Sequence, residues 1–126
     1  MRLHDLLEKY LNSLEVAVAK LPAYAESYAE EILTAERANV RIRLRFDSGY
    51  LLEINEAVVA EESTLVTLGY RYHFQNDANV LMFRYDDTPH FPALPTFPHH
   101  KHTRDTVIAH NKPNLLDVLQ EAAGWV

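Results

Sequence analysis

The 126-residue chain contains no cysteine, only three glycines and no long apolar run. Without cysteine it cannot form disulfides or use a thiolate nucleophile, so any metal would have to be held by histidine and carboxylate groups. The glycines are isolated at positions 49, 69 and 124, which excludes a glycine-rich phosphate-binding loop. No apolar run approaches the roughly 18 residues of a membrane helix, and the charged start lacks the apolar stretch of a signal peptide. We therefore expect a cytoplasmic protein without a membrane partner.

The charge balance is acidic, with 12 lysines and arginines against 18 aspartates and glutamates and a net charge of -6. This balance argues against a DNA-binding protein held by its overall charge, although it leaves room for a local basic patch. The chain is 48% apolar and 24% charged, which is typical of a globular domain. We expect one domain over residues 1–126.

Apolar residues near the start recur every three or four positions, which predicts an amphipathic helix. They are Leu3, Leu6, Leu7, Tyr10, Leu11, Leu14 and Val18. Pro22 interrupts this pattern because proline has no backbone N–H to donate inside a helix. We expect a second helix after it, through Ala23, Tyr28 and Leu33.

From Val40 the apolar residues alternate with arginines, which is the pattern of a half-buried strand. Turn residues then separate four predicted strands at 40–46, 50–60, 64–75 and 80–86, and a further short strand is predicted at 106–109. Asn114 is a suitable N-cap for a last helix. The predicted fold class is α+β, with N-terminal helices packed on a four-stranded or slightly larger antiparallel meander sheet and a short C-terminal helix.

The predicted turns fix which residues lie opposite each other in the sheet. Loops at 47–49, 61–63 and 76–79 place Arg43 opposite Glu53, Glu53 opposite Arg71, and Arg71 opposite Arg84. Arg41, Arg45, Asn55, His73 and Asp86 would flank this row. The Arg71–Arg84 pair is unfavourable unless a carboxylate or a bound anion offsets it. The row is therefore either a solvated face with surface ion pairs or a phosphate-binding surface.

The segment after the fourth strand is rich in histidine and is broken by prolines at 89, 92, 95 and 98. It reads FRYDDTPHFPALPTFPHHKH from Phe83 to His102, and YRYHF precedes it at 70–74. Residues 40–105 resemble the TumE family, whose members typically combine an FRYD strand with a proline-broken loop that ends in TFPHHKH. Family members often carry Asn and a second His where this chain has Asp87 and Phe91. The resemblance implies a toxin that is neutralised by a cognate antitoxin, commonly a helix-turn-helix protein.

Histidine and arginine suit a cofactor-independent ribonuclease. RNA cleavage needs a base for the 2′-hydroxyl, an acid for the leaving 5′-oxygen and cations on the phosphorane-like transition state. Imidazole titrates near neutral pH, and a guanidinium group binds phosphate oxygens in a fork. The candidate catalytic residues are His73, Arg71, Arg84, His99, His100 and His102. The candidate substrate-binding residues are Arg41, Arg43, Arg45 and Lys101 for phosphate, and Tyr85 and Phe97 for stacking on a base.

Two alternatives to this endoribonuclease-type toxin remain open. His100 and His102 would point the same way in an extended chain, and His90 or Asp86 could complete the metal site of a metal-dependent phosphodiesterase. Lys101 and the lack of an HExxH motif count against that metal site. We therefore expect the protein to need no cofactor. The second alternative is a binding module for nucleic acid or protein without turnover. The expected partners are RNA and the antitoxin, in a homodimer or a toxin–antitoxin hetero-oligomer.

Overall fold

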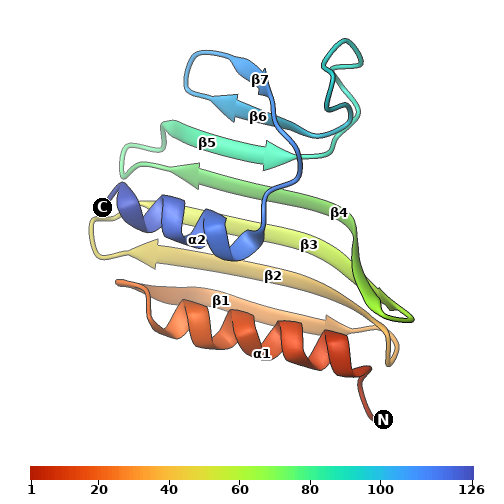
Figure 1. The fold of residues 1–126 in the computed structure, drawn as a ribbon. Helices are drawn as coiled ribbons and strands as arrows, with labels where there is room; N and C mark the ends of the chain where they lie inside the picture. Colours follow the sequence, from red (N-terminus) through yellow and green to blue (C-terminus); the bar gives the residue numbers. More distant parts are fainter.

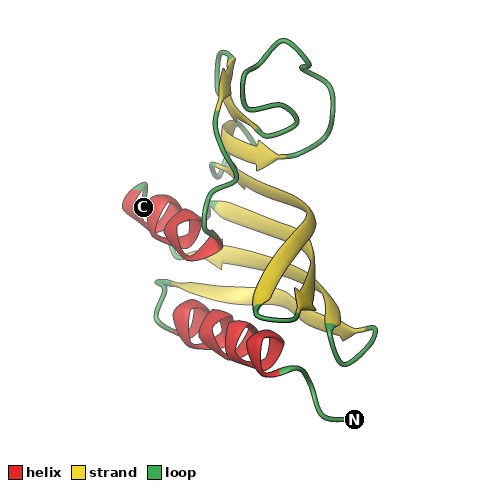
Figure 2. Cartoon of the chain, turned by 45° about the vertical axis from the view of Figure 1, so that its right-hand side comes forward, coloured by secondary structure: helices red, strands yellow, loops and turns green.

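Two helices pack on the same face of a twisted antiparallel sheet in the computed structural model, which describes residues 1–126 (Figures 1 and 2). The seven strands lie in the sheet in the order in which they occur in the sequence. They are β1 (Ala23–Ile32), β2 (Arg37–Phe46), β3 (Leu51–Glu61), β4 (Thr64–Gln75), β5 (Leu81–Asp86), β6 (His100–Thr103) and β7 (Val107–Ala109). The predicted α+β class and antiparallel meander are confirmed, but the sheet is nearly twice the predicted size.

The helices begin at side-chain caps and bury one apolar face each. In α1 (Asp5–Ala19), Nδ1 of His4 accepts a hydrogen bond from the backbone N–H of Leu6 at 3.1 Å. In α2 (Leu115–Gly124), Asn114 caps the first turn in the same way, as predicted. Neither helix is long and apolar enough to cross a membrane.

The core lies between the helices and the covered face of the sheet. Alternate residues of β2 and β4 point into it, including Leu44, Phe46, Tyr72 and Phe74, each no more than 1% exposed. The rings of Phe46 and Phe74 meet edge to face, with their centroids 5.9 Å apart. Burying each large apolar side chain contributes about 1.5–3 kcal/mol. This packing leaves the opposite face of the sheet without helices, and we call it the open face.

The predicted second helix is wrong, because residues 23–32 form the edge strand β1. Alanine and glutamate favour a helix locally, but the backbone of this segment pairs with β2 from Ala23 opposite Phe46 to Ile32 opposite Ala38. A bulge between Ala25 and Ser27 leaves Glu26 out of the pairing. The side chain of Glu26 reaches the arginines of β2 across the open face.

The predicted register is confirmed between β2 and β3 but wrong beyond β3. Arg43 lies opposite Glu53 as expected, whereas Glu53 lies opposite His73 instead of Arg71. The turn after β3 has two residues instead of three, with Glu62 at φ 53°, and β4 carries a bulge at Leu68. Each deviation shifts the pairing by one residue. Beyond the bulge the two shifts sum to an even number, so residues 69–75 keep their predicted face, whereas residues 64–67 carry one shift and lie on the opposite face.

The pairing of β4 with β5 also differs from the prediction. A bulge at Met82 and a longer turn place His73 opposite Arg84, and Arg71 opposite Asp86. The predicted like-charge pair between Arg71 and Arg84 is therefore absent. A carboxylate and an imidazole are the cross-strand neighbours of these arginines.

The strand β6 was not expected, because the sequence placed its residues in the proline-broken loop. Residues 87–99 form that loop, and the chain then pairs with β5 and with β7. His102 lies opposite Arg84, and His100 lies opposite Asp86. The pairing brings both histidines to the open face.

Candidate active site on the open face of the sheet

Two rows of polar side chains cross the open face from β2 to β6. Residues directly opposite in an antiparallel ladder point to the same face, so each row follows from the strand pairing. The first row is Arg41, Asn55, Arg71, Asp86 and His100. The second row is Arg43, Glu53, His73, Arg84 and His102. The structure therefore brings together most of the predicted catalytic residues.

Arg43 and Arg45 are neutralised by carboxylates. Their Nε atoms lie 2.7 and 3.0 Å from the two carboxylate oxygens of Glu26, and Nη1 of Arg43 lies 3.1 Å from Glu53. Hydrogen bonds from Arg45 and Arg43 hold the pKa of Glu26 below its ordinary value. Sequence reasoning missed this carboxylate, because it assigned Glu26 to a helix. Two of the predicted phosphate-binding arginines are thus already paired.

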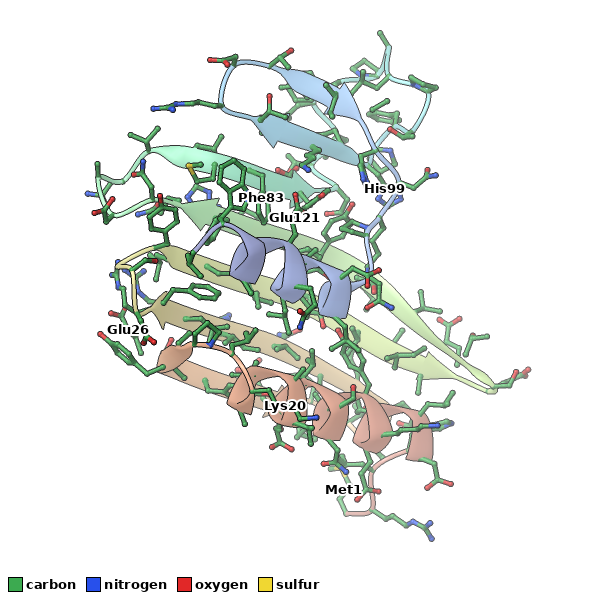
Figure 3. All side chains as sticks on the ribbon, turned by 60° about the vertical axis from the view of Figure 1, so that its left-hand side comes forward. Met1, Lys20, Glu26, Phe83, His99 and Glu121 are labelled. Atoms are coloured by element: carbon green, nitrogen blue, oxygen red, sulfur yellow. The ribbon has the colours of Figure 1, made fainter.

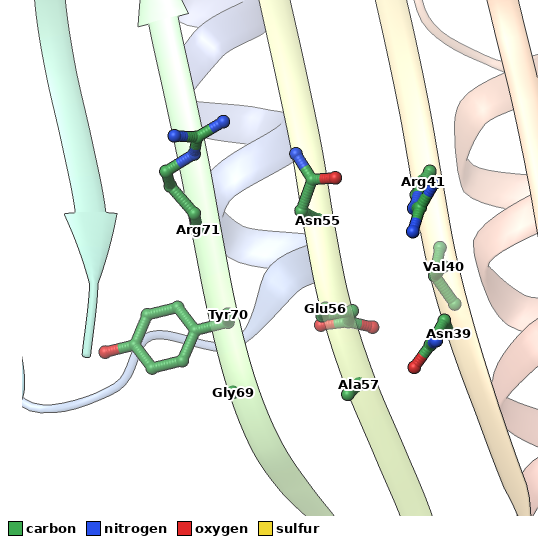
Figure 4. A pocket seen from close by; sticks show the side chains of 9 residues that line it. All are labelled: Asn39, Val40, Arg41, Asn55, Glu56, Ala57, Gly69, Tyr70 and Arg71. Carbon is green, nitrogen blue, oxygen red and sulfur yellow. The ribbon is translucent and has the colours of Figure 1, made fainter. Parts of the chain in front are cut away.

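Arg41 and Arg71 make no ion pair, and both line a pocket of about 270 Å³ on the open face. Figure 4 shows Arg71, Asn55 and Arg41 side by side across β4, β3 and β2, with the helices behind the sheet. Gly69 also lines the pocket and has no side chain to fill it. The pocket therefore combines two free guanidinium groups with an amide group, which is a suitable set for binding an anion.

Arg84 and His73 form a hydrogen-bonded pair. Nε of Arg84 donates to Nδ1 of His73 at 3.1 Å, so Nε2 of His73 carries the imidazole proton and donates to Oε1 of Gln75 at 2.9 Å. Burial, and to a smaller extent the charges of Arg84 and Arg71, lower the pKa of His73. The imidazole is therefore neutral at neutral pH, and both of its nitrogens are engaged.

Asp86, His100 and His102 form a cluster at the β5–β6 edge of the open face. Nε2 of His100 lies 3.0 Å from Oδ1 of Asp86 and 3.1 Å from Nε2 of His102, and Nε2 of His102 lies 3.6 Å from Oδ2 of Asp86. Asp86 and His100 are buried, while the side chain of His102 is 24% exposed. Burial lowers the pKa of His102, with Asp86 opposing. A cluster of this composition can exchange protons or bind a divalent cation.

The remaining predicted residues lie away from the open face. Lys101 and Tyr85 both form hydrogen bonds with Glu121 of α2, at 2.9 and 2.7 Å, on the helix-covered face. Figure 3 labels Glu121 on this face. His99 stacks on the core residue Tyr70 and shares a hydrogen bond of 3.0 Å with its hydroxyl. The alternation of side chains along β5 and β6 separates these residues from the arginines.

Phe97 is the last predicted substrate-binding residue. It lies in the loop between β5 and β6, and its side chain is exposed. Phe91 of the same loop was not predicted, yet its ring packs edge-on against His100 and His102, with centroids 4.9 and 5.8 Å apart. The sequence gives no periodic signal for this contact, because the prolines make the loop irregular.

A family model described as Toxin TumE matches residues 14–126, which include all seven strands and α2. The chain belongs to the TumE toxin family. Membership identifies it as the toxin of a toxin–antitoxin system with a cognate antitoxin as its partner. The resemblance predicted over residues 40–105 is confirmed and extends over most of the chain. No curated protein and no solved structure gives a significant match.

In this TumE toxin the open face therefore carries four groups of polar side chains. These are the pocket lined by Arg41 and Arg71, the Arg84–His73 pair, the Asp86–His100–His102 cluster, and the neutralised arginines of β2.

Proposed function

We propose that the toxin is an endoribonuclease that binds the scissile phosphate of RNA on the open face of the sheet. One observation carries the proposal: Arg41, Arg71 and Arg84 have no carboxylate partner and lie on the same sheet face as a cluster of imidazoles, in a chain that is acidic overall. Guanidinium groups without internal partners favour a phosphate ligand. RNA is the substrate class that offers both phosphates and a 2′-hydroxyl nucleophile.

The three arginines without carboxylate partners bind different parts of the substrate. Arg41 and Arg71 bind a phosphate in the pocket on β2 and β4, together with Asn55. Arg84 lies in the next row, and its hydrogen bond to His73 fixes the direction of its guanidinium group. We therefore assign Arg84 to the negative charge that develops on the phosphate, and His73 to positioning Arg84.

Cleavage follows from attack of the 2′-oxygen on phosphorus. The bond between phosphorus and the 2′-oxygen forms while the bond to the 5′-oxygen breaks. The 2′-hydroxyl proton passes to the Asp86–His100–His102 cluster, and the 5′-oxygen takes a proton from solvent. His102 is the partly exposed member of that cluster and lies directly opposite Arg84. The products are a 2′,3′-cyclic phosphate and a 5′-hydroxyl end.

The cognate antitoxin, of helix-turn-helix type, would inhibit the toxin by placing acidic residues against the same arginines. This proposal rests on the free guanidinium groups of the open face, which suit carboxylates as well as phosphates. An antitoxin whose acidic residues are replaced by their amides should lose inhibition. Retained inhibition would assign the antitoxin to another surface, such as the acidic N-terminal segment.

The experiment is an RNA cleavage assay with toxin freed from its antitoxin. We expect fragments that end in 2′,3′-cyclic phosphate, and we expect a substrate with a single 2′-deoxy residue to resist cleavage at that position while it still binds. Tight binding of RNA without cleavage would show that the protein is a binding module and not a ribonuclease. Equal cleavage of the 2′-deoxy substrate would exclude the 2′-oxygen as the nucleophile.

A further inference from the structure

At the edge of the open face, three side chains each turn one nitrogen or oxygen atom toward a common centre. The cluster consists of Asp86 from β5 and of His100 and His102 from β6, and their ligand atoms all lie within 4.8 Å of one another. The carboxylate of Asp86 and the ring of His100 are almost completely buried. Buried groups of this kind need protons or a cation between them.

The backbone determines where the proton of His100 resides. Nδ1 of His100 lies 2.9 Å from the carbonyl oxygen of Pro98, and a carbonyl can only accept, so Nδ1 carries the proton. In neutral His100 the other nitrogen, Nε2, therefore presents a lone pair. That lone pair faces Oδ1 of Asp86 at 3.0 Å and Nε2 of His102 at 3.1 Å. A proton between Nε2 of His100 and Oδ1 of Asp86, carried by either group, or a cation in the cluster relieves the repulsion.

The spacing of the three groups matches that of metal ligands. Nitrogen and oxygen atoms bound to zinc at about 2.0–2.1 Å with near-tetrahedral angles lie about 3.3 Å apart. The separations in the cluster are 3.0, 3.1 and 3.6 Å. Two histidines and one carboxylate also form a common ligand set of catalytic divalent metals, which keep further positions open.

The surroundings hold each ligand in its orientation. The carbonyl of Pro98 fixes the ring of His100, and the backbone N–H of Thr88 donates to Oδ1 of Asp86 at 3.0 Å. Phe91 covers the edges of both imidazoles. Backbone partners behind the ligands and an apolar cover are the features that orient ligands in metal sites.

The geometry points to a divalent transition-metal site, of the kind that zinc occupies, formed by Asp86, His100 and His102. It deepens the proposed function and rests on it only for the catalytic consequence: a bound metal would supply a Lewis acid and an acidified water beside Arg84, and that water, in place of the imidazoles, would accept the 2′-hydroxyl proton. This favours the metal-dependent alternative over the cofactor-independent mechanism that the sequence favours. Metal binding itself stands independently of cleavage.

The test is titration of chelator-treated full-length toxin with Zn²⁺ in a calorimeter, and with Co²⁺ followed by its visible absorbance. We expect about one metal ion per chain. His102→Gln, which alters the partly exposed ligand, should weaken binding by about 100-fold or more. Asp105→Asn changes an exposed carboxylate in the turn between β6 and β7, outside the cluster, and should bind as wild type does. Circular dichroism of each metal-free variant checks that it is folded.

Two results would overturn the metal site. One is the absence of stoichiometric binding by folded wild type, with nitrogen NMR showing both nitrogens of His100 protonated, because the cluster is then a buried ion pair. The other is unchanged affinity in His102→Gln and in the isosteric Asp86→Asn. Binding of metal by a toxin that never cleaves RNA would sustain the site and overturn the proposed function. EDTA-resistant cleavage by a toxin that binds no metal would overturn the metal site and sustain the proposed function.

Discussion

Arg84 donates a hydrogen bond from Nε to Nδ1 of His73 across β4 and β5, at 3.1 Å. The bond ties together two residues that the sequence suggested as separate catalytic groups. It leaves His73 without a free lone pair, whereas the terminal nitrogens of Arg84 remain available to a substrate. We therefore expect the pair to contact the substrate through Arg84.

A double-mutant cycle tests this arrangement. Arg84→Ala should lower kcat for RNA cleavage by about 10²–10³-fold, because it removes a charge from the transition state. His73→Ala should lower kcat by only about tenfold, the value of one lost positioning hydrogen bond, with little change in KM. The double variant should be no slower than Arg84→Ala alone. Additive losses would show that His73 contacts the substrate independently.

Glu26 is predicted to restrain RNA binding. Its carboxylate binds both Arg43 and Arg45, so Glu26→Gln leaves Arg45 without a carboxylate partner and Arg43 with Glu53 alone. RNA affinity should rise, and the dependence of log K on log salt should steepen by about 0.7 for each new phosphate contact. Glu61→Gln, at an exposed position at the end of β3, serves as the control. Equal salt slopes in both variants would mean that RNA does not reach these arginines.

The buried carboxylate of Glu56 links α1 to the sheet. It accepts hydrogen bonds from the hydroxyls of Tyr10 and Tyr72, and the Tyr72 bond is 2.6 Å long. Burial, followed by the charge of Glu56, raises the pKa of both tyrosines. Tyr72→Phe leaves one carboxylate oxygen without that donor and should lower the free energy of unfolding by about 1–3 kcal/mol in urea titrations. Tyr24→Phe, at an exposed position of β1, should change it by less than about 0.5 kcal/mol.

The pH dependence of stability follows from the lowered pKa of His73. The unfolded chain has an imidazole pKa of about 6.5, so it binds the proton more tightly than the folded protein does. The free energy of unfolding should therefore fall as the pH drops below about 6.5 and through the lowered folded pKa. In the presence of EDTA, His73→Gln should make the free energy of unfolding less dependent on pH below about 6.5. An unchanged profile would place the titrating group elsewhere.

The faces of the strands were predictable from the sequence, but their alignment was not. Alternation in β2 to β5 assigned the side chains to the covered or the open face, and despite the register errors that assignment holds for the members of both polar rows in these strands. The bulges at Leu68 and Met82 depend on how two strands fit together, which no local pattern records. The bulge at Met82 and the longer turn before it moved Arg71 from a predicted arginine neighbour to Asp86.

The helix assigned to residues 23–33 failed for a related reason. Its alanines and glutamates favour a helix, yet an edge strand gains the hydrogen bonds of the β2 ladder. The four prolines before β6 led us to assign its residues to an irregular loop, although the alternation of His100 and His102 matches a strand. Asp86 was recognisable only as an optional partner of these histidines, because the pairing of β5 with β6 is what joins them.

The most direct test of the account is the single-turnover rate of RNA cleavage for Arg71→Ala at concentrations well below saturation, where the rate reports both phosphate binding and the chemical step. The account predicts a rate at least about 100-fold below that of wild type, while Arg104→Ala, at an exposed position between β6 and β7, cleaves at the wild-type rate. Equal rates for wild type, Arg71→Ala and Arg104→Ala would contradict an RNA-cleaving centre on the open face.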